Sequence, residues 1–226
     1  MLTGLGWLAL EVKYLDRARS FYESFLDLQT VRETETEVAL AAGDTDLVLR
    51  RPEAVPRGGL HTHFALSTPH EEYDAWKARL SESFDLVEHQ FGDAKSLYFY
   101  DVDGNCVEIG QRSDEGAGIT GVFEIVLEVA DLDRAEAFYR ALGLEVMGRG
   151  DERRRVRLTA GSFDLELWEP QLGLADGRGG VHVDVGFETD DPDAAVDAVE
   201  ADACSVERLP DEARIVDPDG HHLTFR

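Results

Sequence analysis

Two hydrophobic periods occur along this chain, a period of two and a helical period of about 3.6, and they follow one another in a regular order. Residues 7–12 (WLALEV) alternate, which predicts a strand with one buried face. Residues 15–26 repeat apolar positions at helical spacing, which predicts an amphipathic helix. Two further alternating runs, residues 36–42 and 45–51, flank a turn at Gly43-Asp44 and predict a hairpin.

The same order of elements then returns three times. Residues 61–67 predict a strand, residues 70–82 a helix, and the following residues three strands that end with CVEIGQ at 106–111. In the second half, residues 181–188 predict a strand and residues 190–201 a helix, before short strands at ARIVD and HHLTF. The pattern therefore predicts an α+β protein of four βαβββ units.

The two halves of the chain also repeat one another in sequence. LEVKYLDRARSFY at residues 10–22 matches LEVADLDRAEAFY at 127–139, and DVDGN at 101–105 matches DPDGH at 217–221. DLVLRRP at 46–52 and DLELWEP at 164–170 keep nearly the same offset. Collinear matches of this kind indicate an internal duplication. They predict two domains of two units each, residues 1–113 and 119–226.

The charge of the chain excludes several classes of partner. Asp and Glu number 47 against 22 Lys and Arg, which gives a formal net charge of −25, and only three of the basic residues are lysines. Such a surface repels nucleic acids and anionic membranes. At molar salt the Debye length falls to about 3 Å and the self-repulsion is screened. We therefore expect a salt-adapted protein, with an ordinary acidic protein as the alternative.

The composition also predicts where the protein resides. No run approaches the roughly 18 apolar residues of a membrane span, and the N-terminus lacks the basic start and cleavage site of a signal peptide. We expect a cytoplasmic protein. Cys106 and Cys204 lie far apart without CxxC spacing, so they predict apolar fillers and no thiolate metal site.

Four βαβββ units that carry V-x-D-L-x-R-A-x-x-F-Y and D-x-D-G-N-x-x-E resemble the vicinal oxygen chelate superfamily. This superfamily includes glyoxalase I, extradiol dioxygenases, methylmalonyl-CoA epimerase and the fosfomycin and bleomycin resistance proteins. The resemblance covers essentially the whole chain. It implies two tandem glyoxalase-like domains with open barrel clefts, and a divalent metal bound by the first and last strands of each unit.

The positions that this resemblance assigns to metal ligands differ sharply between units. The first strands of the four units offer Trp7, His63, Glu124 and Asp184, and the last strands offer Val48, Glu108, Glu166 and Thr224. Glyoxalase-like relatives pair a unit of one domain with a unit of the other. Such crossed pairing implies one metal site in units two and three, formed by His63, Glu108, Glu124 and Glu166. The cleft of units one and four would hold no metal, and Trp7 is expected to fill it, with an apolar binding pocket as the alternative.

One imidazole and three carboxylates are a hard donor set, typical of a single divalent ion such as Ni²⁺, Zn²⁺, Mn²⁺, Co²⁺, Mg²⁺ or Fe²⁺. Each residue also has a simpler interpretation, because His63 fits a core or edge histidine and the glutamates fit outward-facing strand positions in an acidic protein. A strand tolerates no one-residue slip in these assignments. His61 and His182 are interpreted as structural. His221 and His222 follow a turn and are expected to be exposed.

The resemblance implies metal-dependent lyase or isomerase chemistry of glyoxalase type on a small oxygen-chelating substrate, such as the hemithioacetal of methylglyoxal and a thiol. Glu108 or Glu124 would move the proton. Glu124 departs from the His or Gln common at that position. The alternatives are an extradiol ring-cleaving dioxygenase, whose two histidines and one carboxylate neither half supplies, and a non-catalytic resistance-type binding protein. A monomer or homodimer is expected, because four units complete both barrels.

Overall fold

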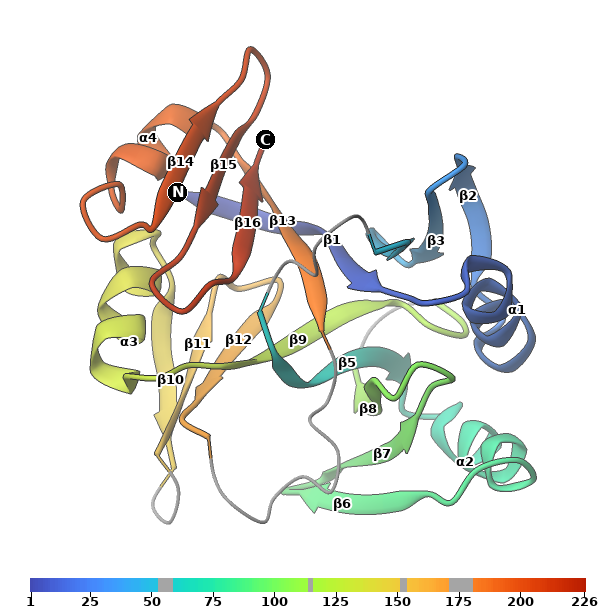
Figure 1. The fold of residues 1–226 in the computed structure, drawn as a ribbon. Helices are drawn as coiled ribbons and strands as arrows, with labels where there is room; N and C mark the ends of the chain where they lie inside the picture. Colours follow the sequence, from blue (N-terminus) through green and yellow to red (C-terminus); the bar gives the residue numbers. More distant parts are fainter. Residues whose placement is uncertain (53–58, 114–115, 151–153, 171–180) are drawn as a thin grey trace.

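The computed structural model describes residues 1–52, 59–113, 116–150, 154–170 and 181–226 of the chain. These residues form two eight-stranded sheets and four helices (Figure 1). The first half contains β1 Leu2–Glu11, α1 Leu15–Leu26, β2 Gln29–Glu33, β3 Glu37–Ala42, β4 Thr45–Arg50, β5 His61–Pro69, α2 Tyr73–Ser81, β6 Val87–Phe91, β7 Ala94–Tyr100 and β8 Cys106–Arg112. The second half contains β9 Gly121–Glu128, α3 Leu132–Ala141, β10 Glu145–Arg149, β11 Arg155–Thr159, β12 Asp164–Trp168, β13 His182–Thr189, α4 Pro192–Asp197, β14 Ser205–Arg208, β15 Ala213–Val216 and β16 His222–Phe225.

The strand order confirms both the four βαβββ units and their crossed pairing. Sheet I runs β14-β15-β16-β13-β1-β4-β3-β2 and therefore joins units four and one. Sheet II runs β10-β11-β12-β9-β5-β8-β7-β6 and joins units three and two. In Figure 1, β1 runs beside β13 and β5 beside β9, and both pairs are antiparallel. Each sheet thus combines one unit from each half; that residues 1–113 and 119–226 are also independent domains stays a prediction.

Local sequence signals account for most of the element ends. Helix α1 occupies the predicted span and turns Leu15, Ala18, Phe21 and Tyr22 into the core. It ends at Asp27, whose backbone is left-handed (φ 55°). The fourth helix is shorter than the predicted 190–201. The Asp191 side chain accepts a hydrogen bond from the backbone N–H of Ala194, but beyond Asp197 bonds of i→i+3 spacing (Val199 to Val196) mix with i→i+4 bonds (Glu200 to Val196), and the regular helix ends.

The two repeated motifs bind one another inside the core. The Tyr22 hydroxyl, from the first FY pair, donates to Asp101 of DVDGN at 2.7 Å. In the second half, the Tyr139 hydroxyl donates to Asp217 of DPDGH at 2.8 Å. Burial, with the adjacent carboxylate, raises the pKa of both tyrosines well above its usual range. These bonds fasten the helix of one unit to the last hairpin of the next unit within each half.

A buried row of three histidines joins the two sheets. Nδ1 of His61 lies 3.4 Å from Nδ1 of His182, whose Nε2 lies 3.1 Å from Nδ1 of His221. His221 then reaches the backbone oxygen of Glu128 at 3.0 Å. The expectation that His221 is exposed was wrong, because its ring packs against Gly59, where a Cβ atom would lie 1.8 Å from Nδ1. The structural interpretation of His61 and His182 agrees with their complete burial.

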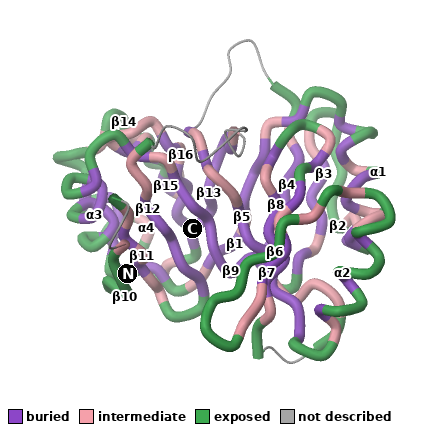
Figure 2. Tube along the Cα trace, turned by 90° about the horizontal axis from the view of Figure 1, so that it is seen from below, coloured by how far each residue is buried: buried purple, intermediate pink, exposed green. Residues whose placement is uncertain are grey.

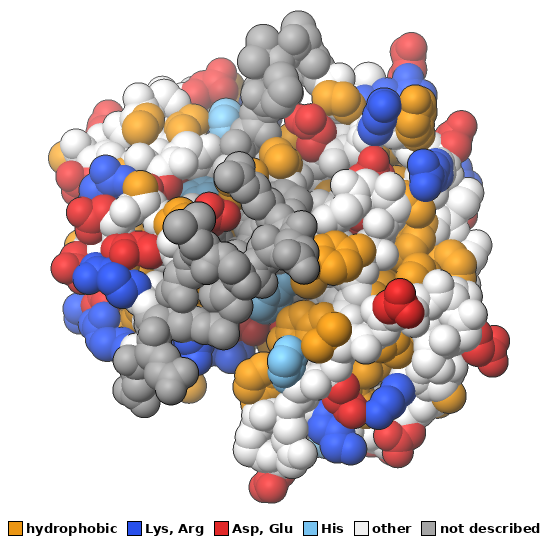
Figure 3. All heavy atoms as spheres, turned by 60° about the horizontal axis from the view of Figure 1, so that its bottom comes forward, with side chains coloured by type: hydrophobic (Ala, Val, Ile, Leu, Met, Phe, Trp, Pro, Cys, Tyr) orange, Lys and Arg blue, Asp and Glu red, His pale blue; other side chains and the backbone are white. Residues whose placement is uncertain are grey.

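Burial is concentrated in the middle strands of both sheets. Figure 2 shows β1, β5, β9 and β13 largely buried, whereas the edge strands β6 and β10 are exposed along their length. Acidic side chains are dispersed over the surface, many beside an arginine or lysine (Figure 3). Among the described residues, no helix is long and apolar enough to cross a membrane.

Candidate metal centre

Strand register brings three of the four expected ligands together in the cleft of sheet II. Parallel pairing of β5 with β8 sets Ala65 beside Glu108, and antiparallel pairing of β5 with β9 sets Ala65 beside Glu124. His63 lies two residues before Ala65 and therefore points to the same face. One potential ligand atom from each of His63, Glu108 and Glu124 lies within 4.8 Å of the other two. Within the described part of the chain, these three form the one such group.

The glutamates of this group are buried with unused acceptor atoms. Glu108 is 3 % exposed and Glu124 is 4 % exposed. Neither Oε2 of Glu108 nor Oε1 of Glu124 accepts a hydrogen bond from the described residues. Nε2 of His63 lies 3.1 Å from Oε2 of Glu108, but not in hydrogen-bonding geometry. A buried carboxylate oxygen without a hydrogen bond is costly, and a cation bound between the two glutamates would offset that cost.

The two glutamates have opposite pKa shifts. Burial opposes ionisation of Glu108, but the close approach of the His63 imidazole and the neighbouring hydroxyls of Ser96 and Tyr98 lower the pKa of its carboxyl. Burial raises the pKa of Glu124 to about 7, and the charge of Glu108 adds to the rise while Arg157 opposes it. The difference follows from the neighbours, since donors surround Glu108 and an acid faces Glu124.

The fourth expected ligand, Glu166, lies on the same face of sheet II but outside this group. It sits on β12 beside Val126, two residues along β9 from Glu124. Its carboxylate makes an ion pair with Arg155. Asp164, which lies beside Glu124, receives two hydrogen bonds from Arg157 at 2.7 and 2.9 Å. The metal role of Glu166 thus stays a prediction.

Sequence reasoning missed the two arginines of β11. Residues 155 and 157 alternate with buried Val156 and Leu158, so the period of two could have placed both arginines on the cleft face. Nη1 of Arg157 lies 3.4 Å from Oε1 of Glu124. The guanidinium of Arg155 lies over the Trp168 ring, 5.9 Å from its centroid. These cations balance part of the acidic charge of the cleft.

Aromatic rings hold His63 in place. The Tyr98 ring meets the imidazole edge-on at 5.3 Å between centroids, and the Trp168 ring does so at 6.3 Å. Tyr98 belongs to β7 and pairs with Glu108 across the strands. The imidazole is therefore positioned by packing before any ligand binds, which favours a preorganised site.

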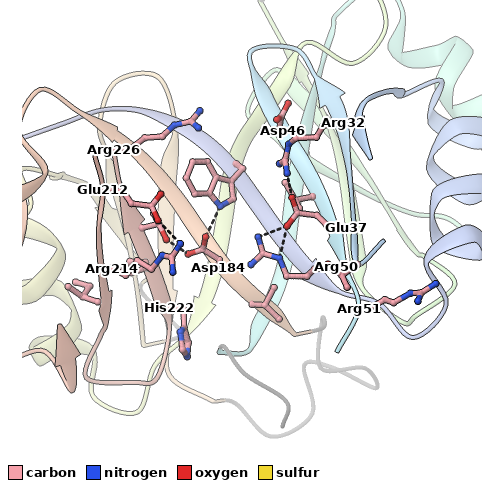
Figure 4. A pocket seen from close by; sticks show the side chains of 17 residues that line it. Arg32, Glu37, Asp46, Arg50, Arg51, Asp184, Glu212, Arg214, His222 and Arg226 are labelled. Atoms are coloured by element: carbon pink, nitrogen blue, oxygen red, sulfur yellow. Dashed lines mark hydrogen bonds and ion pairs between the residues drawn. The ribbon is translucent and has the colours of Figure 1, made fainter. Parts of the chain in front are cut away.

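The equivalent positions of sheet I form no such group. Trp7 Nε1 donates to Oδ2 of Asp184 at 2.7 Å, and the Thr224 hydroxyl donates to Oδ1 at 2.9 Å (Figure 4). Val48 supplies no donor atom. Both oxygens of Asp184 are therefore satisfied by side chains that bind no metal. The expectation that Trp7 fills this cleft was wrong, because a cavity of 630 Å³ remains, and the indole packs flat over Gly186 instead.

The residues of sheet II fit a hard divalent ion. One potential ligand atom from each of the three residues lies within 4.8 Å of the other two, which is close enough for one ion to be shared among them. An imidazole and two carboxylates suit first-row divalent metals better than thiophilic ones. His63, Glu108 and Glu124 would hold such an ion, whose positive charge would satisfy the two unused carboxylate oxygens.

Comparison with known proteins places the whole chain in one superfamily. The profile of the Glyoxalase/Bleomycin resistance protein/Dioxygenase superfamily matches residues 4–109 and 121–225. Catechol-2,3-dioxygenase of Bacillus subtilis (strain 168) is 26% identical over 280 aligned positions, which cover 99% of this chain and 97% of that protein. Metallothiol transferase FosB of Staphylococcus haemolyticus is 26% identical over 122 positions, which cover 51% of this chain and 88% of the relative.

The solved structures show the same architecture. Glyoxalase I from Zea mays superposes with a TM-score of 0.73 at 21% identity, covering 98% of this chain and 91% of that chain. This likeness concerns the fold. Members of the superfamily are mostly metal-dependent enzymes, and the donor group in sheet II agrees with that property. The chain belongs to the Glyoxalase/Bleomycin resistance protein/Dioxygenase superfamily, which is also known as the vicinal oxygen chelate superfamily.

Proposed function

We propose that this protein is a divalent-metal-dependent lyase or isomerase of glyoxalase type. Its substrate would be small and carry two adjacent oxygens, such as the hemithioacetal of methylglyoxal and a small thiol. The observation that carries the proposal is the His63, Glu108 and Glu124 group, with two buried carboxylate oxygens that accept no hydrogen bond from the described residues. A divalent ion bound there would act as a Lewis acid toward the adjacent oxygens of the substrate.

The contacts of the two glutamates suggest different roles. Glu108 is held by His63, Ser96 and Tyr98, so it is suited to remain a fixed ligand. Glu124 has no such set of donors, and its nearest cation, Arg157, is engaged with Asp164. Glu124 is therefore the carboxylate that can swing toward the substrate and carry the proton.

The arginines of β11 would control the charge around the reaction. Arg157 lies beside both Glu124 and Asp164, where it stabilises negative charge on either carboxylate. Arg155 holds Glu166 through an ion pair. Entry of a divalent ion would compete with Arg155 for Glu166, and an arginine displaced in this way would be available to an anionic group of the substrate.

A second candidate is extradiol ring cleavage. It is favoured by the similarity to a catechol-2,3-dioxygenase over nearly the full length of both proteins. The donor group argues against it, because non-haem Fe(II) oxygenases use two histidines and one carboxylate with open positions. In the described part of sheet II, the group instead has one histidine and two carboxylates.

One experiment separates the two candidates. Metal-free protein is loaded with Ni²⁺, Zn²⁺, Mn²⁺, Co²⁺ or, under anaerobic conditions, Fe²⁺, and each form is assayed with methylglyoxal plus a panel of small thiols and with catechol. We expect thioester formation that is lost in Glu124→Gln and retained in Asp184→Asn, the matched change in the other cleft. Ring cleavage of catechol by the Fe²⁺ form alone would replace the proposal with the dioxygenase assignment. Ligand binding without turnover by any form would indicate a binding protein.

We also propose that the acidic surface is an adaptation to salt and that the protein works as a monomer or homodimer in the cytoplasm. A net charge of −25 repels itself at low ionic strength and is screened near molar salt. The melting temperature should rise steadily as KCl increases from 0.1 to roughly 2 M. A melting temperature that does not depend on KCl would contradict salt adaptation. Light scattering in the same buffers would give the oligomeric state.

A further inference from the structure

The cleft of sheet I concentrates arginine side chains in an otherwise acidic protein. Its cavity of 630 Å³ is of the size that small-molecule sites have. Acidic residues outnumber basic ones 47 to 22 over the whole chain, but the cavity lining reverses this order. Five arginines line it, namely Arg32, Arg50, Arg51, Arg214 and Arg226, against four acids, namely Glu37, Asp46, Asp184 and Glu212.

Three of the four acids of this lining, Glu37, Asp184 and Glu212, are bound by side chains of the lining itself. Glu37 receives Arg50 at 2.7 Å and also pairs with Arg32, so one carboxylate serves two guanidiniums. Both oxygens of Asp184 accept hydrogen bonds from Trp7 and Thr224. Arg32, Arg50 and Arg214 use part of their donor capacity on Glu37 and Glu212, and each guanidinium has five N–H donors, so donors remain for a ligand.

The arginines also stand on opposite walls. Arg50 and Arg51 come from the end of β4, whereas Arg214 lies on β15 and Arg226 follows β16 (Figure 4). Neither Arg51 nor Arg226 makes an ion pair with a carboxylate of the described residues. The Arg226 guanidinium lies over the Trp7 ring, 4.7 Å from its centroid. Stacking holds the guanidinium plane and leaves its N–H edge able to donate to a planar oxyanion.

We propose that the cleft of sheet I binds a small organic polyanion whose carboxylate or phosphate groups bridge the arginines of its two walls. Arg226 and Arg50 are the principal contacts, and the Trp7 indole provides an apolar surface between them. The guanidinium fork matches carboxylate and phosphate oxygens in a bidentate manner, which selects oxyanions over halide ions. The inference does not depend on the chemistry of sheet II, because His63, Glu108 and Glu124 do not line this cavity.

Calorimetric titration of the full chain tests this inference. Succinate and glycerol 3-phosphate are the anionic probes, and succinamide and glycerol are their uncharged counterparts, all at one KCl concentration. We expect saturable binding of at least one anion, with one molecule per chain, and no binding of the uncharged counterparts. Binding should weaken about tenfold in Arg226→Gln and in Arg50→Gln. The anion that binds more tightly identifies the oxyanion that the cleft prefers.

Two control variants test whether the anion binds specifically in the cleft of sheet I. Arg112 stacks on Phe123 at 4.7 Å, the same geometry as Arg226 on Trp7, but lies outside this cleft. Arg112→Gln should therefore leave the affinity within about twofold, and so should Glu108→Gln in sheet II. Absence of saturable binding for both anions would overturn the proposal. Equal weakening in Arg112→Gln, or loss of binding in Glu108→Gln, would overturn it too, and circular dichroism would verify that each variant is folded.

Discussion

Sheets I and II are built from the same paired βαβββ units, but the side chains on their inner faces differ in charge. In sheet II, His63, Glu108 and Glu124 converge, and two carboxylate oxygens accept no hydrogen bond from the described residues. In sheet I, the equivalent strands present Trp7, Asp184, Val48 and Thr224, and both Asp184 oxygens are satisfied. The register of the paired βαβββ units thus brings equivalent side chains close together in both sheets. The type of these side chains determines whether the position is suited to a cation.

The arginines follow the same division. Arg157 of β11 and Arg214 of β15 occupy corresponding places, because each pairs with the third residue of its unit's last strand, Glu166 or Thr224. In sheet II this arginine is held between Glu124 and Asp164. In sheet I it lines an open cavity with four other arginines. Trp7, Val48 and Thr224 stand in sheet I where sheet II has carboxylates, which agrees with our proposals that sheet II binds a cation and sheet I an anion.

Loss of one ligand in sheet II should have the largest effect. His63→Ala or Glu108→Gln should reduce metal affinity by more than the roughly 10- to 100-fold typical of a lost supporting hydrogen bond, because a direct donor is removed. Elemental analysis of purified protein would measure the metal content. Asp184→Asn, which changes the residue of sheet I at the position equivalent to His63, should keep the full metal content. If Asp184→Asn lost the metal as well, the division between the clefts would be wrong.

The second prediction tests whether Glu166 is a ligand of the metal. If Glu166 leaves Arg155 to bind the metal, Glu166→Ala should lower metal affinity by only about 10- to 100-fold, because breaking the ion pair with Arg155 offsets part of what this ligand contributes. Arg155→Ala should preserve or increase it, since the competing cation is gone. Competitive titration with a chelating dye would measure both. Unchanged affinity in Glu166→Ala would restrict the site to His63, Glu108 and Glu124.

A smaller effect is expected from the contact between Trp7 and Gly186 in sheet I. A Cβ atom on Gly186 would lie 2.0 Å from the indole, so Gly186→Ala should force Trp7 aside and destabilise the fold by about 1–3 kcal/mol. Gly148, also in a strand, has no atom within 4 Å of such a Cβ, and Gly148→Ala should change stability by less than about 1 kcal/mol. Urea unfolding would compare the two. Equal destabilisation would mean that Trp7 does not rest on Gly186.

The smallest effect is the pH dependence of Asp184. Burial raises the pKa of its carboxyl, although Trp7 and Thr224 oppose the rise by hydrogen bonding. The folded state then holds the proton more tightly than the unfolded state. Stability due to this group is therefore highest below its unfolded pKa and falls as pH rises through the folded value. Asp184→Asn removes this slope, because an amide can still accept from Trp7 and donate to Thr224.

Melting curves between about pH 4 and pH 8 would measure the difference between Asp184→Asn and the parent protein. We expect Asp184→Asn to gain stability relative to the parent as pH rises, by no more than about 2 kcal/mol. A parent protein that gains stability relative to Asp184→Asn over this range would show that the Asp184 carboxylate is favoured by folding. In that case Asp184 would be ionised in the folded protein, and its pKa would lie below the unfolded value.

The amino-acid sequence by itself determined the scaffold and the positions of the candidate ligands. Hydrophobic periods predicted α1 at residues 15–26, and the repeat predicted four units. The ligand positions and the shared cleft of units two and three were implied by the resemblance to the vicinal oxygen chelate superfamily, which the strand order then matched. These properties depend on local backbone preference and on the alternation of faces along a strand, both of which can be read along the chain.

The tertiary structure alone decided what each side chain meets. It paired Glu166 with Arg155, buried His221 against Gly59, and set Trp7 over Gly186 so that an arginine-lined cavity remains. These outcomes depend on registers between strands that are distant in sequence and on the direction taken by long, flexible side chains. A strand pattern indicates the face on which a residue lies, but the partner across that face comes from another strand, and only the folded chain brings the two together.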